Sequence, residues 1–257
     1  MSKIFIIKSG LTDYVEGSMK GITNGVEMFY KCGNITSFKK NLPSLTNGSS
    51  MFSNCTNLTS FSSEIPSLTN GSSMFNKCSK LTSFSVALPN ITNTTGMFQE
   101  TSITSFNIDL PSVTITKSMF HSCTKLKFFS GDLSSLTDGS YMFNKCSGIT
   151  SFNVDLPSLT NGSYMFSTCT SLTSFSSNLA SLTNGQYMFG SGTSSGTKLD
   201  LASVQNIATT INDLASQGKT GKINIGMANS IQGNTELEAA LATIRGKGWT
   251  VTEIYKS

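Results

Sequence analysis

The sequence predicts an α/β repeat solenoid with one long parallel sheet, and three observations lead to this class. The dipeptide Met-Phe recurs with a period of 23 residues and one step of 22, at positions 28, 51, 74, 97, 119, 142, 165 and 188. One half of each copy alternates apolar and polar residues, which is typical of a strand with one buried face. The other half carries turn residues, so each copy is one coil that must stack on its neighbours to bury its apolar face.

The elements of one unit follow from its consensus, Leu-Thr-Ser-Phe-x-(Val/Ile/Ser)-x-Leu-Pro-Ser-Leu-Thr-Asn-Gly-Ser-x-Met-Phe-x-x-Cys. The alternating half, as in residues 106–110, predicts a strand, and the proline after it ends the hydrogen-bonded ladder. Asn-Gly or Asp-Gly, as in 47–48, predicts a turn with a positive φ angle. The segment Ser-x-Met-Phe-x-x-Cys has room only for short turns or a brief α or 3₁₀ helix on the convex side.

Three inward-facing columns are predicted to form the core. One consists of the phenylalanines of Met-Phe, and the other two of strand residues. The strand columns are Phe38, Phe61, Phe84, Phe106, Phe129, Phe152 and Phe175, and Leu42, Leu88, Leu110, Leu133, Leu156 and Leu179. The fourth regular unit is one residue shorter and lacks cysteine, so we expect a local irregularity over residues 94–117.

The two ends of the chain depart from the repeat. Residues 1–20 are predicted to be an N-terminal cap with a degenerate first repeat, beginning with a strand over 1–8, and residues 21–190 hold the leucine-containing repeats. Residues 191–257 continue the coil pitch with a new pattern, which predicts an αβαβ-like C-terminal cap. Its elements are expected as a strand at 199–201, a helix over 204–214, a strand at 223–225, a helix over 235–245 and a strand at 249–254.

The composition excludes several kinds of partner. Charged residues make up 12% of the chain, about half the usual share, and the net charge is +4. The basic residues are spread out and not interleaved with aromatic residues on one face, so we expect no nucleic-acid partner. The apolar run at residues 4–7 is too short for a signal peptide or a membrane span. We therefore expect a virion protein, or one that is extracellular after lysis, with a cytoplasmic location as the alternative.

No group of residues predicts catalysis, a cofactor or a metal site. The cysteines occur once per unit, at 32, 55, 78, 123, 146 and 169, so no Cys-x-x-Cys metal pattern exists. Stacked coils would place neighbouring cysteines about 5 Å apart, within disulfide range, but free buried thiols fit as well and are favoured here. The one histidine, His121, cannot form a repeated nucleophile pair and is interpreted as an exposed polar residue. The sequence therefore predicts a protein that is not an enzyme.

The polar strand residues form columns on the open face of the predicted sheet. We predict that a ligand-binding face contains Glu64, Asn107, Asp109, Asp132, Asn153, Asp155 and Asn178. Its three aspartates would lie on adjacent strands about 5 Å apart. Like charges at this spacing repel unless a cation or a basic partner neutralises them, so the column is either a site for Ca²⁺ or a ligand amine, or a solvated acidic stripe.

The unit at 81–91, with the Met-Phe-x-x-Cys that follows it, resembles a leucine-rich repeat of the treponemal, or BspA-like, class. Units of that class read Leu-x-x-Ile-x-(Leu/Ile)-Pro-x-x-Leu-x-x-Ile-x-x-x-Ala-Phe-x-x-Cys; here Met replaces the Ala before Phe, and Phe replaces the second strand aliphatic. The resemblance covers about residues 11–190 and implies a leucine-rich-repeat solenoid. Such proteins act as adhesins and protein-binding modules on bacterial surfaces and in protist secretomes. The tail Gly-Trp-Thr-Val-Thr at 248–252 is similar to repeat proteins of gut bacteria and their phages.

These observations predict a non-enzymatic structural or recognition protein that binds a protein or a glycan on its open sheet face. The expected setting is a phage virion or tail, with other virion proteins as further partners. Two alternatives stay open. One is a BspA-like adhesin of a bacterial surface, and the other is an architectural part of an assembly that is bound through its ends.

Overall fold

The computed structural model describes residues 19–190 and 196–256, so the strand predicted over 1–8 lies outside the described part. The repeats contain six strands of two residues each: β1 (Ser37–Phe38), β2 (Ser60–Phe61), β3 (Ser105–Phe106), β4 (Phe128–Phe129), β5 (Ser151–Phe152) and β6 (Ser174–Phe175). The C-terminal part contains α1 (Leu201–Thr210), the 3₁₀ turn η1 (Ala215–Gln217), β7 (Gly221–Ala228), the 3₁₀ turn η2 (Asn229–Ile231), α2 (Thr235–Gly246) and β8 (Trp249–Lys256).

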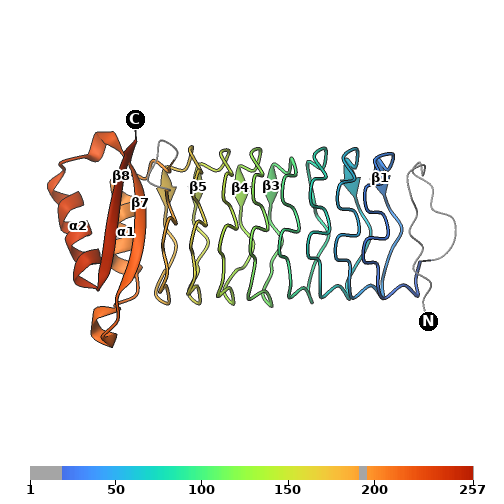
Figure 1. Ribbon diagram of the computed structural model, residues 1–257, viewed down its shortest axis with the longest axis horizontal. Coiled ribbons are helices and arrows are strands. Elements are labelled where there is room, and N and C mark those ends of the chain that lie inside the picture. The colour runs from blue at the N-terminus through green and yellow to red at the C-terminus, as the bar shows by residue number, and fades with distance from the viewer. Residues whose placement is uncertain (1–18, 191–195, 257) are drawn as a thin grey trace.

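Successive repeats lie side by side as the coils of a stack, and the last coil adjoins the α/β cap (Figure 1). Parallel bridges join the coils at the residue before the glycine slot, beginning with Asn24 and Asn47 and continuing at every repeat to Asn184. The same half of the coil donates backbone hydrogen bonds to the next coil, for example from Gly48 N–H to the carbonyl of Asn70 at 2.8 Å. The continuous backbone contact therefore runs along the Asn-Gly half of the repeat.

The predicted single long sheet does not form. The strand half of the repeats instead gives three separate two-stranded parallel sheets, β1–β2, β3–β4 and β5–β6. Within a pair the strand phenylalanines are in register, as Phe38 with Phe61, and Ser62 N–H donates to the carbonyl of Phe38 at 3.0 Å. The coil that carries Phe84 has no strand. The ladder of backbone hydrogen bonds between coils is thus interrupted in the half predicted to be a strand. It is continuous in the Asn-Gly half, which was predicted to be a turn.

The expectation of a positive φ angle at the Asn-Gly glycines is wrong. Among the described glycines only Gly96, Gly218, Gly233 and Gly248 have positive φ. The repeated glycine is required by a close approach instead: a Cβ atom on Gly48 would lie 3.1 Å from the sulfur of Met74 and 3.2 Å from Cδ1 of Leu68. Methionine in the next coil fills the space that a side chain at this slot would need.

Turns, and not helices, form the Met-Phe segment throughout residues 19–190. Its N–H groups alternate between a carbonyl three residues back and a carbonyl of the next coil; Met51 N–H donates to Gly48, and Phe52 N–H donates to Met74. This path requires left-handed backbone at two slots of each coil, the residue before Met and the residue before Cys, as at Ser50 (φ 54°). The turns satisfy backbone groups both within a coil and between coils, so a helix is not needed.

The predicted core columns are confirmed. Phenylalanines of Met-Phe stack on one another with ring centroids 5.1–5.7 Å apart. Strand phenylalanines form a second stack with spacings of 5.7–6.5 Å, of which the widest separates Phe84 and Phe106. Rings of the two stacks meet edge to face, as Phe38 and Phe52 do at 4.8 Å, which is a favourable geometry for aromatic pairs. The leucine column is also buried.

The irregular region at 94–117 differs from the other repeats in its side chains, while the bridge ladder continues through it from Asn93 to Ile115. Thr94 and Thr116 occupy the glycine slot in two successive coils. Both are fully buried, and neither hydroxyl has a hydrogen-bond partner among the described residues. Thr101 takes the cysteine slot, and its hydroxyl donates to a carbonyl of its own coil. The departure thus changes the side chains at these slots, while the sequence of bridges between coils is kept.

The C-terminal cap has the predicted order α1, β7, α2, β8, but its first boundary differs. A strand was expected at 199–201, whereas α1 begins at Leu201 and Asp200 caps it by accepting a hydrogen bond from Ser203 N–H at 2.8 Å. The expected strand is confirmed only at Leu199, which forms a parallel bridge with Met227. The aspartate cap, which satisfies an N–H group at the first turn of α1, ends it there. The bridge between Gly185 and Ile223 carries the ladder of the coils into β7.

The two long strands of the cap pair in parallel over their full length, from Gly221 with Trp249 to Ala228 with Lys256. The helices α1 and α2 pack on each other, and α2 also packs against β8 (Figure 1). Leu237, Leu241 and Ile244 of α2 are fully buried. The cap therefore covers the apolar end of the last coil with a hydrophobic layer of its own.

Candidate binding site

The predicted acidic column lies on the exposed strand side, but its carboxylates already bind the backbone. Asp109 Oδ1 accepts a hydrogen bond from Asp132 N–H in the next coil at 3.0 Å, and Asp155 Oδ1 accepts one from Asn178 N–H at 3.1 Å. Asp132 turns to its own coil and accepts from Ser134 N–H at 2.8 Å. These bonds stabilise each carboxylate without a cation.

Asn41 and Glu64 occupy the slot of the acidic column in two earlier coils, and they form the same kind of bond between coils. Asn41 Oδ1 accepts from Glu64 N–H at 3.0 Å, and its Nδ2 donates to the Glu64 carboxylate at 3.1 Å. These side-chain bonds join the coils that also form strand pairs. Within the described residues, no group of three or more His, Cys, Asp or Glu side chains is arranged to hold a metal ion.

One large apolar side chain stands out on this face. Phe128 is 64% exposed, and it occupies a slot that is serine in the neighbouring coils, Ser105 and Ser151. Phe128 pairs in register with Ser105. Lys127, which is also exposed, precedes it in a slot that is otherwise threonine in the neighbouring coils. Aromatic residues are enriched in protein interfaces, so an exposed phenylalanine in a slot of small polar residues is a candidate contact for a protein partner.

We define the central face as the exposed strand positions of three adjacent coils around Phe128. It consists of Ser105, Asn107 and Asp109; Phe128, Ser130 and Asp132; and Ser151, Asn153 and Asp155. Five of the seven predicted site residues belong to this face. Of the other two, Glu64 lies nearer the N-terminus and Asn178 lies in the next coil towards the cap. The structure therefore brings together most, but not all, of the predicted site.

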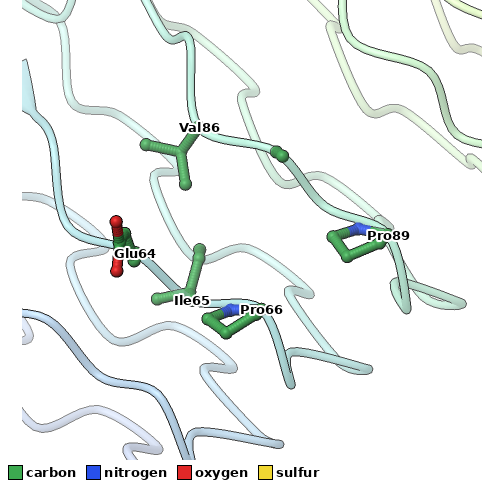
Figure 2. A pocket seen from close by; sticks show the side chains of 6 residues that line it. Glu64, Ile65, Pro66, Val86 and Pro89 are labelled. Carbon is green, nitrogen blue, oxygen red and sulfur yellow. The ribbon is translucent and has the colours of Figure 1, made fainter.

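Glu64 lies instead beside an open gap in the strand side. Figure 2 shows Glu64, Ile65 and Pro66 of one coil across from Val86 and Pro89 of the next, around a cavity of about 190 Å³. The gap falls where β2 has no strand partner on this side. In the side-chain hydrogen bonds between coils, the side chain of one coil accepts from the backbone N–H of the next, so the acceptor between these two coils would be Glu64. The Glu64 carboxylate instead accepts from Asn41 Nδ2 of the preceding coil at 3.1 Å.

The cysteine ladder is a packing feature. All six cysteines are buried and free, as predicted. The thiol of Cys55 donates to the carbonyl of Phe29 in the preceding coil at 3.0 Å. Cys78, Cys123, Cys146 and Cys169 make the same contact with the coil before them. Burial raises the pKa of Cys55 from 9.0 to about 12. These thiols therefore stay protonated and are poor nucleophiles.

His121 is half-buried, contrary to the expectation of an exposed residue. Its Nδ1 atom is buried and has no hydrogen-bond partner among the described residues. Burial, and then the nearby charge of Lys145, lower the pKa of the imidazole. The neutral ring therefore packs in a slot that holds small polar residues in other coils.

Sequence reasoning missed the exposed Phe128 and a column of three tyrosines, of which Tyr141 is exposed and Tyr164 and Tyr187 are half-buried. Phe128 was hidden because it directly precedes a core phenylalanine, and Tyr141, Tyr164 and Tyr187 because they directly precede Met-Phe. The signal that could have found them is departure from the consensus at an exposed slot. Serine fills the slot of Phe128 in the other coils, whereas serine and tyrosine each fill the slot before Met in three of the eight copies.

The stack of short parallel elements, each carrying a buried leucine and phenylalanine, defines a leucine-rich repeat protein. The family model for the "BspA type Leucine rich repeat region" matches in 6 copies, over residues 15–95 and 90–215. The chain therefore belongs to the BspA-type leucine-rich repeat family.

Comparison with solved structures agrees with this assignment. The chain is similar to a leucine-rich repeat protein from Bacteroides ovatus ATCC 8483, with a TM-score of 0.50 and 18% sequence identity. The similarity covers 90% of this chain and 66% of that one. At this identity the likeness shows the fold alone. The comparison with curated proteins finds no match.

The described residues contain no helix that is both long and apolar enough to cross a membrane. The two α-helices have 10 and 12 residues, whereas a membrane-spanning helix needs about 20.

Proposed function

We propose that this chain is a non-enzymatic recognition protein whose coils form a solenoid and whose central face binds a protein partner. The observation that carries the proposal is Phe128, an aromatic side chain with 64% of its surface exposed in a slot of small polar residues. Exposing a phenylalanine to water is unfavourable by about 2 kcal/mol. A partner that covers the ring recovers this free energy.

The surroundings of Phe128 favour a protein over a flat apolar surface. Lys125 and Lys127, which are close to Phe128 in the sequence, are exposed and positively charged, while Asp132 and Asp155 of the central face are exposed and negatively charged. Mixed charge around an apolar centre resembles the rim and core of a protein interface. The rigid aromatic core beneath positions Phe128, because the adjacent Phe129 packs 5.7 Å from Phe106.

A photo-crosslinking experiment tests the proposal. A benzophenone amino acid placed at position 128 should crosslink to a specific protein in an extract of the organism that makes this chain. The same amino acid at Ser60, which occupies the equivalent slot three coils away, should not crosslink to that protein. The partner identified in this way is then purified for a direct binding measurement. We expect Phe128→Ser to weaken that binding by roughly thirty-fold, since loss of a hot-spot aromatic costs about 2 kcal/mol.

Phe128→Ser installs the consensus residue, so it should leave the fold unchanged in circular dichroism. Asp132→Asn is a second variant: it keeps the oxygen that accepts from Ser134 N–H, and it should change binding but not the fold. Equal crosslinking at 60 and 128, or unchanged affinity in both variants, would contradict recognition through the central face.

We further propose that the protein is part of a phage virion or phage tail. The proposal is supported by the C-terminal segment 248–252, which is similar to repeat proteins of gut bacteria and their phages. Mass spectrometry of purified virions tests this setting. A bacterial surface adhesin predicts the protein in cell-envelope fractions instead. A purely architectural part predicts that its assembly covers residues 199–257 and leaves Phe128 exposed.

A further inference from the structure

We propose a second binding site, for an acidic carbohydrate, at the junction between the last coil and the cap. The site is a cavity of about 240 Å³ lined by Gln186, Tyr187, Lys222, Asn224, Thr250 and Thr252. Its residues lie in the coil that follows the central face and in β7 and β8, and none of them belongs to that face, so the site does not depend on the function proposed above.

The tyrosine at this cavity ends a column of three. Tyr141 and Tyr164 stack with ring centroids 4.5 Å apart and an interplanar angle of 7°, whereas Tyr187 is tilted by 36° to Tyr164 at 4.7 Å. The two stacked rings cover each other's faces. Tyr187, at the end of the column, is tilted away from that stacking and lines the cavity.

The column is confined to the three coils next to the cap, and it forms despite backbone strain. In the other coils the same slot holds Glu27, Ser50, Ser73, Gly96 and Ser118. All three tyrosines have φ of 58°, a left-handed conformation that is unfavourable for a bulky residue. Serine or glycine would satisfy the fold in this slot, so the fold does not explain an aromatic residue there.

The polar side of the cavity comes from the two long strands of the cap. Lys222 pairs with Thr250 and Asn224 pairs with Thr252, so the four side chains are neighbours on one face of β7 and β8. Asn224 is almost fully buried, with an exposed fraction of 6%. Its Oδ1 accepts from Tyr187 N–H at 2.8 Å, which fixes the amide and directs Nδ2 away from that bond.

Lys222, Thr250 and Thr252 are exposed, so the hydrogen-bond donors on this side of the cavity are available to a ligand. Within residues 19–190 and 196–256, the structure gives no acceptor to Lys222 Nζ, Asn224 Nδ2 or the hydroxyls of Thr250 and Thr252. A matching ligand must supply several acceptor oxygens, one of them charged, together with an apolar face for the tyrosine ring. A hexuronate unit of a glycan has this combination: ring hydroxyls, a carboxylate for the ammonium group, and axial C–H groups.

Isothermal titration with tetragalacturonate tests the proposal, with neutral cellotetraose and a short oligothymidylate as comparison ligands. We expect saturable binding of tetragalacturonate and at least about ten-fold weaker binding of cellotetraose, because the neutral sugar lacks the charge-assisted bond to Lys222. Lys222→Ala should remove this preference. The matched control is Lys219→Ala, which removes an exposed lysine of the same cap outside the cavity.

Tyr187→Ser should weaken tetragalacturonate binding by about ten-fold. Tyr141→Ser is its control, because it makes the same change in the same backbone conformation two coils away. Circular dichroism checks that each variant is folded. Absence of saturable binding at millimolar tetragalacturonate, or equal binding by wild type, Lys222→Ala and Tyr187→Ser, would overturn the proposal. Tighter binding of oligothymidylate would overturn it as well, by assigning the site to nucleic acid.

Discussion

A methionine of the next coil decides which residue can follow the repeated asparagine. The side chain of Met74 lies over Gly48, and any Cβ atom there would have to displace it or Leu68. Thr94 and Thr116 hold this slot only in the irregular region, where each buries a hydroxyl without a partner. A buried hydroxyl that makes no hydrogen bond lowers stability by about 1–3 kcal/mol.

We predict that Thr94→Val raises the free energy of unfolding by about 1 kcal/mol, because valine keeps the shape and removes the unpaired hydroxyl. Urea denaturation followed by circular dichroism measures the change. Thr92→Val, two residues away, is the control: its hydroxyl donates to the carbonyl of Thr69 at 3.1 Å, so its loss should lower stability or leave it unchanged. A destabilised Thr94→Val protein would show that the hydroxyl has an undetected role.

The predicted and observed site residues also differ at the residue scale. The acidic column was predicted from its period, and the structure places Asp109, Asp132 and Asp155 on the exposed strand side as expected. Period alone could not show that Asp109 accepts a hydrogen bond from the backbone of the next coil. Phe128 was missed because periodic reasoning looks for what recurs, whereas this exposed aromatic residue occurs once in its slot.

At the scale of elements, the strand side is built from pairs of coils. The pairs β1–β2, β3–β4 and β5–β6 coincide with the places where a side chain of one coil accepts from the backbone of the next. The gap of Figure 2 lies between the coils of Glu64 and Ala87, where the Glu64 carboxylate accepts from Asn41 of the preceding coil. Asp132 accepts from its own coil, and β4 and β5 do not pair. Pairing of the two-residue strands thus accompanies the bond from the side chain to the next coil.

We predict that Asp109→Ala lowers the free energy of unfolding by about 1 kcal/mol, the usual net contribution of one hydrogen bond. Asp109→Asn should cost less, because its Oδ1 can still accept from Asp132 N–H. Urea denaturation of the two variants side by side measures the difference. Hydrogen exchange at the amide of residue 132 should accelerate in Asp109→Ala alone. Equal effects of the two substitutions would indicate that charge, and not the hydrogen bond, matters here.

At the scale of the whole molecule, the coils of the stack are equivalent units that can be removed one at a time, whereas the cap is a unique end without which the last coil is exposed. Each coil contacts the coils on either side of it, so its contribution to stability repeats along the stack. The last coil, by contrast, buries its end against β7 through the bridge between Gly185 and Ile223. Phe189 of that coil is fully buried, and it would be exposed without the cap.

We predict that deleting residues 139–161, one full period of 23 residues, leaves a folded protein. The deletion joins Asp138 to Gly162 in the same slots, so the core columns stay in register, and only the stability of one coil is lost. Deleting residues 139–150 breaks the register and should abolish cooperative unfolding. So should truncation after residue 190, which exposes the end of the core. Calorimetry distinguishes these outcomes, and a folded truncated protein would contradict the role assigned to the cap.

The sequence by itself determined the repeat, its period, the buried columns and the free cysteines, because each depends on a side-chain pattern that recurs in every coil. It also predicted the order of elements in the cap, where helical spacing is regular. Only the tertiary structure decided which half of the coil forms the continuous ladder. That choice depends on the fit of Gly48 beneath Met74 and on whether a side chain accepts from the next coil, as Asp109 does, or from its own, as Asp132 does. The sequence pattern shows which residues recur, but not which of these contacts each of them makes.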